Sequence, residues 1–412
     1  MFPKINGQPA EAPICLRGWG SFDMSKHRAR LDNVKKHHLV ADVYGIDAQW
    51  YGISGGSGNW FDDAGDWDVS EVIYPNGLHE LSELAADAGL AFSAWMEHER
   101  VGKNSHMFHE SRLPMLRDKD WALLDLGKAE CRDYIFGKIC SLIDETGMKV
   151  FRTDFNIAPA GVFAANDPEG RRGLTELRYY RGLYELLDRL LEKYPSLIID
   201  NCASGGRRLD YEMGKRAFPI MCRSDYFCAQ PDFGENGMQN MTLCLSRWLP
   251  VFGDSLGTCM QSGRTINVGD TYRLRSAITC GISIACPDFE MTEEEAAWYR
   301  KMLSDARRIR EYMSRDFWPL GGASFCEKDL FAYQAADPES KSGMAAFFRR
   351  SECPVSGITL NLRAIIPDAS YELEDIDAGV IGVMSGSELV NYQLSLPKPR
   401  SERIVFYRCL ER

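Results

Sequence analysis

Residues 197–210 read LIIDNCASGGRRLD, a short apolar run that ends abruptly in polar and small residues. The run is of strand length, and its unbroken apolar character is typical of a parallel strand buried on both faces. Asp200, Asn201 and Cys202 follow where such a strand would end. Ligand sites in α/β folds lie at the carboxyl ends of parallel strands. The stretch therefore predicts a buried strand that delivers polar groups to a functional surface.

Further apolar runs of similar length recur along the chain, and segments with helical periodicity separate them. The runs occupy residues 14–20, 41–50, 90–99, 148–156, 197–202 and 218–225. The helical segments occupy residues 78–89, 130–147, 176–194 and 293–313. Strands that alternate with helices form a parallel sheet with helical crossovers, and about eight such units fit a closed barrel. We therefore expect an α/β fold, with a (β/α)8 TIM barrel over residues 14–315 and an extension at 1–13.

The sequence changes in character after the last expected helix. Short β-rich segments follow one another without helices between them, and Pro, Gly, Asp and Ser separate them. These segments occupy residues 331–336, 343–350, 358–364 and 401–411. Residues 316–412 are therefore expected to form a small antiparallel β-sandwich domain.

Composition and charge exclude several classes of partner. The 412 residues carry a formal net charge of -11, and a nucleic-acid-binding chain normally shows a basic patch instead. The most basic segment, RRGLTELRYYR at 171–181, has its arginines at helical spacing, which is typical of a solvated helix face. We expect no nucleic-acid partner.

Cysteine usage and the amino terminus favour a cytoplasmic protein. The 13 cysteines are an odd number, and most stand singly inside apolar runs, so we expect them to be reduced. The start of the chain lacks the basic and then apolar pattern of a signal peptide, and no run of about 18 apolar residues occurs. No membrane association is therefore expected.

Polar residues at the expected strand ends provide candidate chemistry. In a barrel all these ends converge on one face, so carboxylates far apart in sequence become neighbours. Two carboxylates that face a sugar are the minimum for a retaining glycosidase. A strand-end carboxylate is often only the cap of the next helix, but Asp154 and Asp225 have no convincing helix start directly after them. These two are the best candidates for catalysis.

Two other kinds of site are weaker alternatives. Glu97 and Glu99 flank His98, and HMFH at 106–109 adds two histidines, but neither group has the repeated spacing of a zinc site. We expect no metal and no cofactor. A thiol mechanism would use Cys202 as nucleophile, for which His98 is the only histidine near a strand end that could activate it.

Taken together, the motifs resemble one family, the melibiase-type α-galactosidases of glycoside hydrolase family 36. The resemblance runs from about residue 14 to the end of the chain, and its strength lies in the order of the motifs. They are IDAQWYG (46–52), GDWDV (65–69), YPNGL (74–78), AWMEHERV (94–101), LLDLGKAECRDYIF (123–136), FRTDFN (151–156), NCASGGRRLD (201–210) and RSD (223–225). Members share a (β/α)8 barrel and a retaining double displacement, so the resemblance implies both.

The resemblance assigns the two catalytic roles. The family nucleophile ends a Lys-x-Asp strand and falls on Asp154, and the general acid/base is the Asp of a Ser-Asp pair that falls on Asp225. The nucleophile must stay ionised, which a cation such as Arg152 favours, whereas the acid needs a raised pKa. The two carboxyl groups should lie about 5–5.5 Å apart if the enzyme retains configuration.

The resemblance also implies substrate-binding positions. Asp47 matches the residue that accepts hydrogen bonds from galactose hydroxyls, and Trp50 and Trp95 match aromatic walls of the pocket. Cys202 and Gly205 belong to the loop that faces the 2-hydroxyl, where a glycine lets the backbone approach the sugar. Arg207 and Arg208 are expected mainly to position this loop.

Three departures from the family pattern bear on substrate choice and assembly. Many members have two consecutive acidic residues where this chain has Asp47 and Ala48, so one hydroxyl contact is missing. The strand lysine of the family is replaced by Arg152, and a planar guanidinium forms hydrogen bonds with hydroxyl groups in a different geometry from an ammonium group. Arg152 is also expected to contact the sugar. The large amino-terminal β domain of typical members is expected to be absent, since the barrel begins almost at once.

The expected function is therefore an exo-glycosidase that removes terminal α-linked galactose-type residues through a covalent glycosyl-Asp intermediate. An α-N-acetylgalactosaminidase or α-galactosaminidase is the nearest alternative, because the same barrel can widen around C2. A carbohydrate-binding relative that has lost catalysis is an alternative from another class. Transfer to a sugar instead of water would use the same residues. The expected partner is a small-molecule carbohydrate, and a homo-oligomer stays open.

Overall fold

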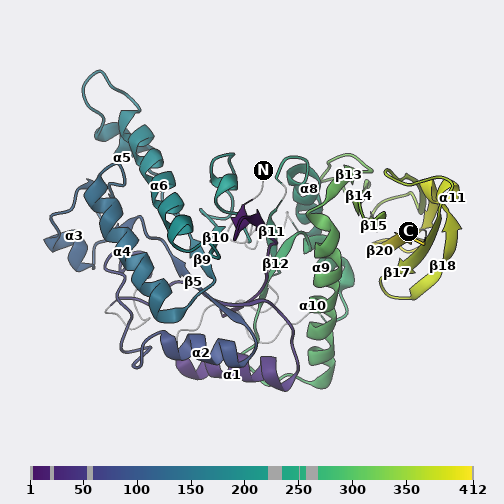
Figure 1. The fold of residues 1–412 in the computed structure, drawn as a ribbon, viewed down its shortest axis with the longest axis horizontal. Helices are drawn as coiled ribbons and strands as arrows, with labels where there is room; N and C mark the ends of the chain where they lie inside the picture. Colours follow the sequence, from purple (N-terminus) through teal and green to yellow (C-terminus); the bar gives the residue numbers. More distant parts are fainter. Residues whose placement is uncertain are drawn as a thin grey trace.

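The structure is a computed structural model that describes residues 3–18, 23–52, 59–220, 234–249, 251–256 and 268–410. Its first part is built on a parallel sheet that curls round on itself (Figure 1). The seven strands stand in the order β10, β9, β5, β4, β3, β12, β11. Their bounds are β3 (Ile14–Gly18), β4 (Val43–Ile46), β5 (Ala91–Met96), β9 (Val150–Thr153), β10 (Ile198–Asn201), β11 (Gly253–Leu256) and β12 (Gly281–Ala285).

The segment 218–220 closes this sheet into a barrel by filling the place between β10 and β11. Phe218 forms a parallel bridge with Asp200 of β10. On its other side, the Gly253 amide of β11 donates to the Pro219 carbonyl. A Cβ at Gly253 would lie 2.4 Å from the Ile220 carbonyl oxygen, so this approach requires glycine. The structure thus has eight strand positions, and the predicted (β/α)8 barrel is confirmed.

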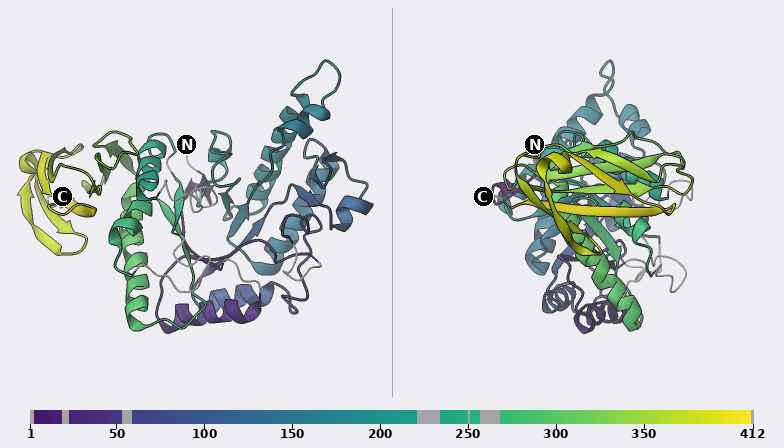
Figure 2. Two further views of the ribbon diagram at one scale, coloured as in Figure 1. Left: turned by 180° about the vertical axis from the view of Figure 1, so that it is seen from behind. Right: turned by 90° about the vertical axis from the view of Figure 1, so that its right-hand side faces the viewer.

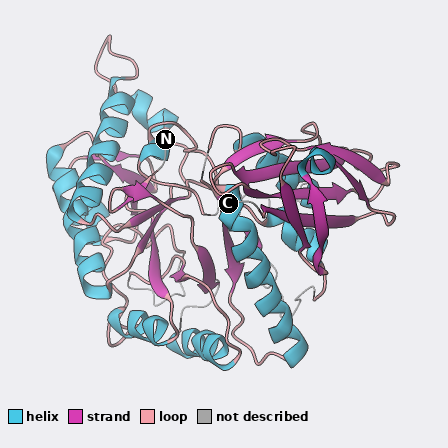
Figure 3. Cartoon of the chain, turned by 45° about the vertical axis from the view of Figure 1, so that its right-hand side comes forward, coloured by secondary structure: helices cyan, strands magenta, loops and turns pink. Residues whose placement is uncertain are grey.

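Helices cover the outside of the barrel, as Figures 1 and 3 show. The longer ones are α1 (Met24–Lys36), α2 (His79–Asp87), α4 (Ala129–Thr146), α6 (Leu174–Lys193), α8 (Glu235–Leu245), α9 (Thr271–Ala277) and α10 (Glu293–Met313). The shorter ones are α3 (His106–Glu110), α5 (Ala160–Ala165) and the 3-10 turn η1 (Met213–Lys215). The helix predicted at 293–313 coincides with α10, and Gly147 ends α4 in the left-handed conformation with φ 60°.

Two small sheets lie outside the barrel wall. The amino-terminal hairpin consists of β1 (Lys4–Ile5) and β2 (Gln8–Pro9). Between β5 and α4 the chain forms an antiparallel sheet of β6 (Arg100–Gly102), β8 (Trp121–Leu124) and β7 (Met115–Arg117), in that order. The sequence motifs gave no sign of this second sheet, which adds a wall beside the carboxyl end of β5.

Antiparallel strands follow α10 and form the predicted β-sandwich (Figure 2). One sheet has six strands in the order β13 (Asp316–Pro319), β14 (Leu330–Asp337), β15 (Ser342–Arg349), β20 (Ser401–Cys409), β17 (Ser370–Asp375), β18 (Gly379–Ser385). The other pairs β16 (Gly357–Asn361) with β19 (Asn391–Ser395), and α11 (Gly386–Val390) lies between β18 and β19 in the chain. Phe347 and Tyr407 of the first sheet share a buried cluster with Leu360 and Leu394 of the second.

The central strands β14, β15 and β20 of the six-stranded sheet are buried on their other face as well, against the barrel. Met344 and Phe348 of β15 belong to the same core cluster as Leu303 and Ile309 of α10. Side chains alternate across a strand, so β15 contributes to both cores at once. Ion pairs also join the barrel to the antiparallel sheet. Arg275 of α9 pairs with Asp305 of α10, with Asp377 after β17 and with Glu402 of β20.

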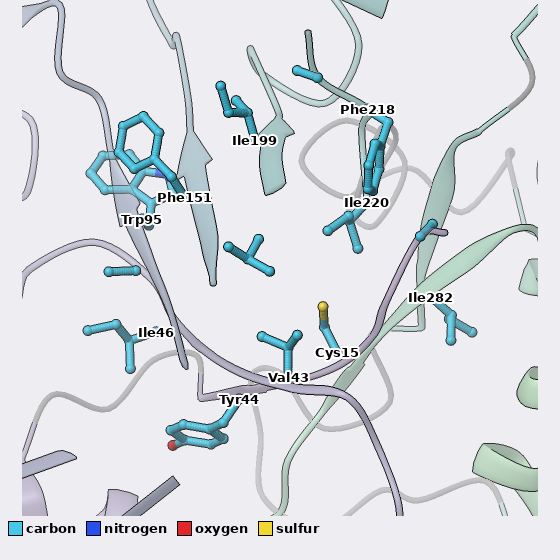
Figure 4. Packing of buried hydrophobic residues seen from close by; sticks show 14 of the residues in the cluster. Cys15, Val43, Tyr44, Ile46, Trp95, Phe151, Ile199, Phe218, Ile220 and Ile282 are labelled. Carbon is cyan, nitrogen blue, oxygen red and sulfur yellow. The ribbon is translucent and has the colours of Figure 1, made fainter. Parts of the chain in front are cut away.

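The barrel strands bury apolar side chains, and the charged side chains of Arg17, Arg152 and Asp200 are buried with them. Figure 4 shows Cys15, Val43, Phe151, Ile199 and Ile220 among the buried side chains of neighbouring strands. None of the cysteines in the described ranges is joined in a disulfide bond. A search of the helices in these ranges finds none that could cross a membrane.

Candidate active site

Asp154 is the residue on which the site centres. It directly follows β9, at the carboxyl end of the barrel strands, and its side chain is buried. Its Oδ1 accepts the backbone N–H groups of Phe155 at 2.7 Å and Ser204 at 3.0 Å. Its Oδ2 accepts the indole N–H of Trp95 at 2.9 Å. These donors bind the ionised carboxylate better than the acid.

The charges around Asp154 also favour its ionised form. Burial works against ionisation, but the Arg152 cation and the hydrogen bonds from Trp95 and Ser204 outweigh it and lower the pKa of Asp154. Arg152 does not bind this carboxylate directly. Its Nη1 donates to Asp200 Oδ2 at 2.9 Å, and Arg17 Nη2 donates to the same oxygen at 2.8 Å. The two cations share one buried anion, which leaves this layer with a net positive charge beneath Asp154.

A cavity of about 390 Å3 opens over Asp154. Asp47, which follows β4, lies on its wall, as do Trp95 of β5 and Asn156 beyond β9. The remaining wall is formed by Ala48, Gln49 and Trp60. The structure thus brings together three of the residues that the sequence singled out: Asp47, Trp95 and Asp154. A pocket with an aromatic wall and a few convergent polar groups is typical of a small-molecule site.

Trp50 and Arg152 lie behind this cavity and do not line it. The Trp50 indole is buried and donates to the Trp95 carbonyl at 2.6 Å, and its ring packs edge-on against Tyr51 at 5.2 Å. Arg152 is buried in its ion pair, although its Nε has no hydrogen-bond partner within the described ranges. Direct contact of either residue with a sugar stays a prediction.

The loop after β10 approaches Asp154 through its backbone. Ala203, Ser204 and Gly205 follow one another with φ of 53°, 51° and 90°. This left-handed run is costly for the two residues that carry a Cβ, and strain of this kind persists where surrounding contacts hold it. It turns the Ser204 amide toward the nucleophile candidate. Cys202 is buried, and its Sγ accepts the Gly205 amide at 3.3 Å, so facing a 2-hydroxyl stays a prediction for both residues.

A buried ion pair anchors the far side of this loop. Arg208 donates to both oxygens of Glu99, at 2.7 and 2.9 Å, and its guanidinium lies 3.9 Å from the ring centre of Phe155. Tyr179 of α6 also donates to Glu99, at 2.7 Å. Burial opposes ionisation of Glu99, but Arg208 outweighs it and lowers the pKa of that carboxyl. The expectation that Arg208 positions the loop agrees with these contacts.

Glu97, which the sequence suggested only as part of a weak metal-site alternative, is a second carboxylate close to Asp154. It is fully buried and binds Arg100 Nε at 3.0 Å and the Asn156 amide. Burial is the main reason why its pKa rises to about 7, and the charge of Asp154 adds to the rise. Its position directly after β5, at the carboxyl end of a barrel strand, was the available signal.

Asn156, Ser204 and Trp60 were also missed as site residues. Ser204 Oγ donates to Asn156 Oδ1 at 2.6 Å, which joins the loop after β10 to the loop after β9. Asn156 could have been found from its place two residues after Asp154 in FRTDFN. Trp60 comes from a long loop, where no periodicity marks a wall residue.

Asp225, the expected general acid/base, lies outside the described residues, as does its neighbour Ser224. Its distance from Asp154 therefore stays a prediction.

The metal alternative gains no support from the described residues. They contain no group of three or more His, Cys, Asp and Glu side chains that could hold an ion. His98 instead pairs its Nδ1 with the Thr153 hydroxyl at 3.1 Å. Burial lowers the pKa of His98 to about 4, which keeps it neutral at pH 7.

Comparison with known proteins gives a consistent result. The family model described as Melibiase matches residues 4–229. The bifunctional α-galactosidase/sucrose kinase AgaSK of Mediterraneibacter gnavus is 28% identical over 97% of this chain and 41% of its own length. The α-galactosidase AgaA of Geobacillus stearothermophilus is 23% identical over 96% of this chain and 54% of its own.

Solved structures share the fold. The galactosidase domain of AgaSK superimposes with a TM-score of 0.76 at 21% identity, over 97% of this chain and 55% of that one. A variant of AgaA in complex with raffinose gives a TM-score of 0.78 at 21% identity, over 97% and 56%. The chain thus spans about half the length of these relatives or less.

Proposed function

Since the chain belongs to the melibiase family, we propose that it is a retaining exo-α-galactosidase with Asp154 as its nucleophile. The observation that carries the proposal is the setting of Asp154, a buried carboxylate with a lowered pKa on the wall of a small cavity. A nucleophile must be ionised at neutral pH and must face the substrate, and the lowered pKa of Asp154 and its place on the cavity wall support this role. The relatives named above are α-galactosidases, and one was solved with raffinose bound.

In the proposed first step, an Asp154 oxygen attacks the anomeric carbon, and the bond from that carbon to the leaving oxygen breaks. Asp225 gives its proton to the leaving oxygen, and a covalent galactosyl ester forms at Asp154. Asp225 then takes a proton from water, which attacks the same carbon and releases Asp154. Two inversions at one carbon give net retention.

The described residues would contribute to this chemistry in distinct ways. Trp95 and the Ser204 amide hold the Asp154 carboxylate in one orientation, and they stabilise its charge both before attack and when the ester breaks. Asp47, which also lines the cavity, would accept hydrogen bonds from sugar hydroxyls. Arg152 acts on Asp154 by charge and holds Asp200 in place beneath the site.

The decisive test is chemical rescue of Asp154→Ala. We expect this variant to lose release of galactose from aryl α-galactosides, and added azide should restore turnover with β-galactosyl azide as product. Asp68→Asn changes an exposed carboxylate that pairs with Lys138 and does not line the cavity, and this variant should retain full activity. Full activity in Asp154→Ala, or release of β-galactose as the first product of the unmodified enzyme, would contradict the proposal.

A panel of aryl α-glycosides separates galactose from its C2 variants. Substrates carrying galactose, N-acetylgalactosamine, galactosamine, glucose and arabinopyranose should give the highest kcat/KM for galactose. A higher kcat/KM for the N-acetylgalactosamine or galactosamine substrate would instead indicate an α-N-acetylgalactosaminidase or an α-galactosaminidase.

A further inference from the structure

A cavity of about 610 Å3 lies outside the candidate active site, between the barrel and the β-sandwich. It is larger than the cavity over Asp154, which has about 390 Å3, and the two share no lining residue. Its volume lies in the range of pockets that bind small molecules. We call it the rear cavity. Its walls come from four segments of the chain, namely Tyr211, residues 246–248, residues 314–316 and residues 337–339.

The rear cavity belongs to the opposite end of the barrel from Asp154. Helices of a (β/α)8 barrel run antiparallel to its strands, so their carboxyl ends lie beside the amino ends of the strands. Residues 246–248 follow the end of α8, and residues 314–316 follow the end of α10. Asp154, in contrast, follows the carboxyl end of β9. A small ligand in the rear cavity would therefore not reach the Asp154 carboxylate.

We propose that the rear cavity is a second carbohydrate site, which binds a neutral oligosaccharide and takes no part in its cleavage. This inference goes beyond the function proposed above and does not depend on it, because none of the residues involved lines the candidate active site. Two features support the proposal: the exposed aromatic rings of the rear cavity, and its charged side chains of both signs.

Trp248 and Tyr211 give the rear cavity its aromatic surface. Trp248 is 44% exposed and Tyr211 is 66% exposed. The chain beneath them is anchored, since Leu249, which follows Trp248, belongs to a small buried cluster against which Leu209 packs. Aromatic rings offer a large apolar face to the C–H groups of a sugar, and a ring on an anchored chain loses little conformational entropy when a ligand covers it.

Five charged side chains line the rear cavity. They are Arg247, Arg315, Asp316, Asp337 and Glu339. Asp337 accepts the backbone amide of Glu339 at 3.0 Å. None of the five forms an ion pair with another residue in the ranges that the structure describes. Hydroxyl groups can donate to the carboxylates and accept from the guanidinium groups, so a ligand with many hydroxyls can use both.

The mixture of charges argues against other classes of small ligand. An anion would lie next to three carboxylates, and a cation would lie next to two guanidinium groups. An apolar ligand would take water away from these charged groups without replacing its hydrogen bonds. A neutral oligosaccharide avoids all three costs, and it also presents C–H faces to Trp248 and Tyr211.

The test measures binding of stachyose, a neutral tetrasaccharide, to Asp154→Ala, in which cleavage should be lost. Equilibrium dialysis should find two sites per chain. Adding Trp248→Ala should raise the Kd of one site about tenfold, which is about 1.4 kcal/mol. Adding Trp248→Phe instead keeps an aromatic face and should recover most of the loss. Phe325→Ala removes an exposed ring that does not line the rear cavity, and it should change neither site.

The number of sites separates this inference from the proposed function. If Asp154→Ala binds stachyose at a single site and Trp248→Ala weakens that site, the rear cavity binds the sugar and the proposed function fails. If Trp248→Ala changes no site, the inference is wrong, whatever the cavity over Asp154 binds. The inference is also wrong if Trp248→Ala changes the oligomeric state in analytical ultracentrifugation, because the cavity would then be a contact between copies. An unchanged urea midpoint shows that the variant is folded.

Discussion

The indole N–H of Trp95 donates to Asp154 Oδ2 at 2.9 Å, while the carbonyl of the same Trp95 accepts the Trp50 indole at 2.6 Å. One tryptophan thus holds the candidate nucleophile and is itself held from behind. The orientation of Asp154 therefore depends on a residue that does not line the cavity.

We expect Trp95→Phe to impair catalysis by removing the donor to Asp154. Loss of a hydrogen bond to a charged group costs about 1.5–3 kcal/mol, so kcat/KM should fall by roughly one to two orders of magnitude. The lowered pKa of Asp154 should also rise toward its usual value. The acid limb of the pH profile of kcat/KM would then move to higher pH. An unmoved limb would show that Trp95 acts only as a wall.

Glu99→Gln tests whether the Arg208 ion pair positions the loop after β10. The variant leaves Arg208 buried with a neutral partner, so the Ser204 amide should be held less firmly on Asp154. The acid limb of kcat/KM should again shift to higher pH. A double-mutant cycle with Arg208→Met should show coupling of at least about 0.5 kcal/mol in unfolding free energy. If the two substitutions changed the unfolding free energy additively, Glu99 and Arg208 would not be coupled.

Asp200→Asn should destabilise the barrel strongly. The change leaves Arg17 and Arg152 buried side by side without the anion that they share. Removal of one member of a buried ion pair costs about 3–5 kcal/mol, which urea denaturation can measure. Asp68→Asn breaks an exposed pair with Lys138 and should cost less than about 1 kcal/mol. If both variants lost a similar amount of unfolding free energy, the pairing of Arg17 and Arg152 with Asp200 would not stabilise the barrel as proposed.

Glu97 should make stability fall as the pH rises from about 4.5 to about 7. Burial raises the pKa of Glu97 from its usual 4.5 to about 7, so the folded protein binds the proton more tightly than the unfolded chain in this window. Above the window, the buried carboxyl must ionise at a cost of about 3 kcal/mol. Glu97→Gln removes this titration, so unfolding free energies of the two proteins should diverge below pH 7. If the difference between the two unfolding free energies stayed the same from pH 4.5 to pH 7, this prediction would be wrong.

The parts of the site that follow a strand were predictable, and the parts on long loops were not. Asp47, Trp95 and Asp154 stand at or next to the carboxyl ends of strands, where barrel geometry brings distant residues together. Trp60 belongs to a long loop, and its position on the cavity wall does not follow from a repeating pattern. Trp50 shows a further limit, since an aromatic residue in a motif can lie one layer behind the surface.

The fold was predictable for a related reason. Apolar runs that alternate with amphipathic helices leave few topologies, and the eight strand positions agree with that expectation. The replacement of a full helix by η1 between β10 and the 218–220 strand was not predictable. The strand position at 218–220 itself falls at the start of the apolar run predicted at 218–225, and the contacts of Phe218 and Pro219 close the sheet there.

The shared core between α10 and the six-stranded sheet has a consequence for how this protein can be taken apart. A barrel cut free after Met313 would present the Leu303 and Ile309 stripe to water, and the severed sheet would expose Met344 and Phe348. Neither piece is a self-sufficient module, so the two halves should melt in one calorimetric transition. A gene fusion that transfers the barrel to another protein must therefore include the β-sandwich as well, or provide another domain that covers the apolar surface of α10.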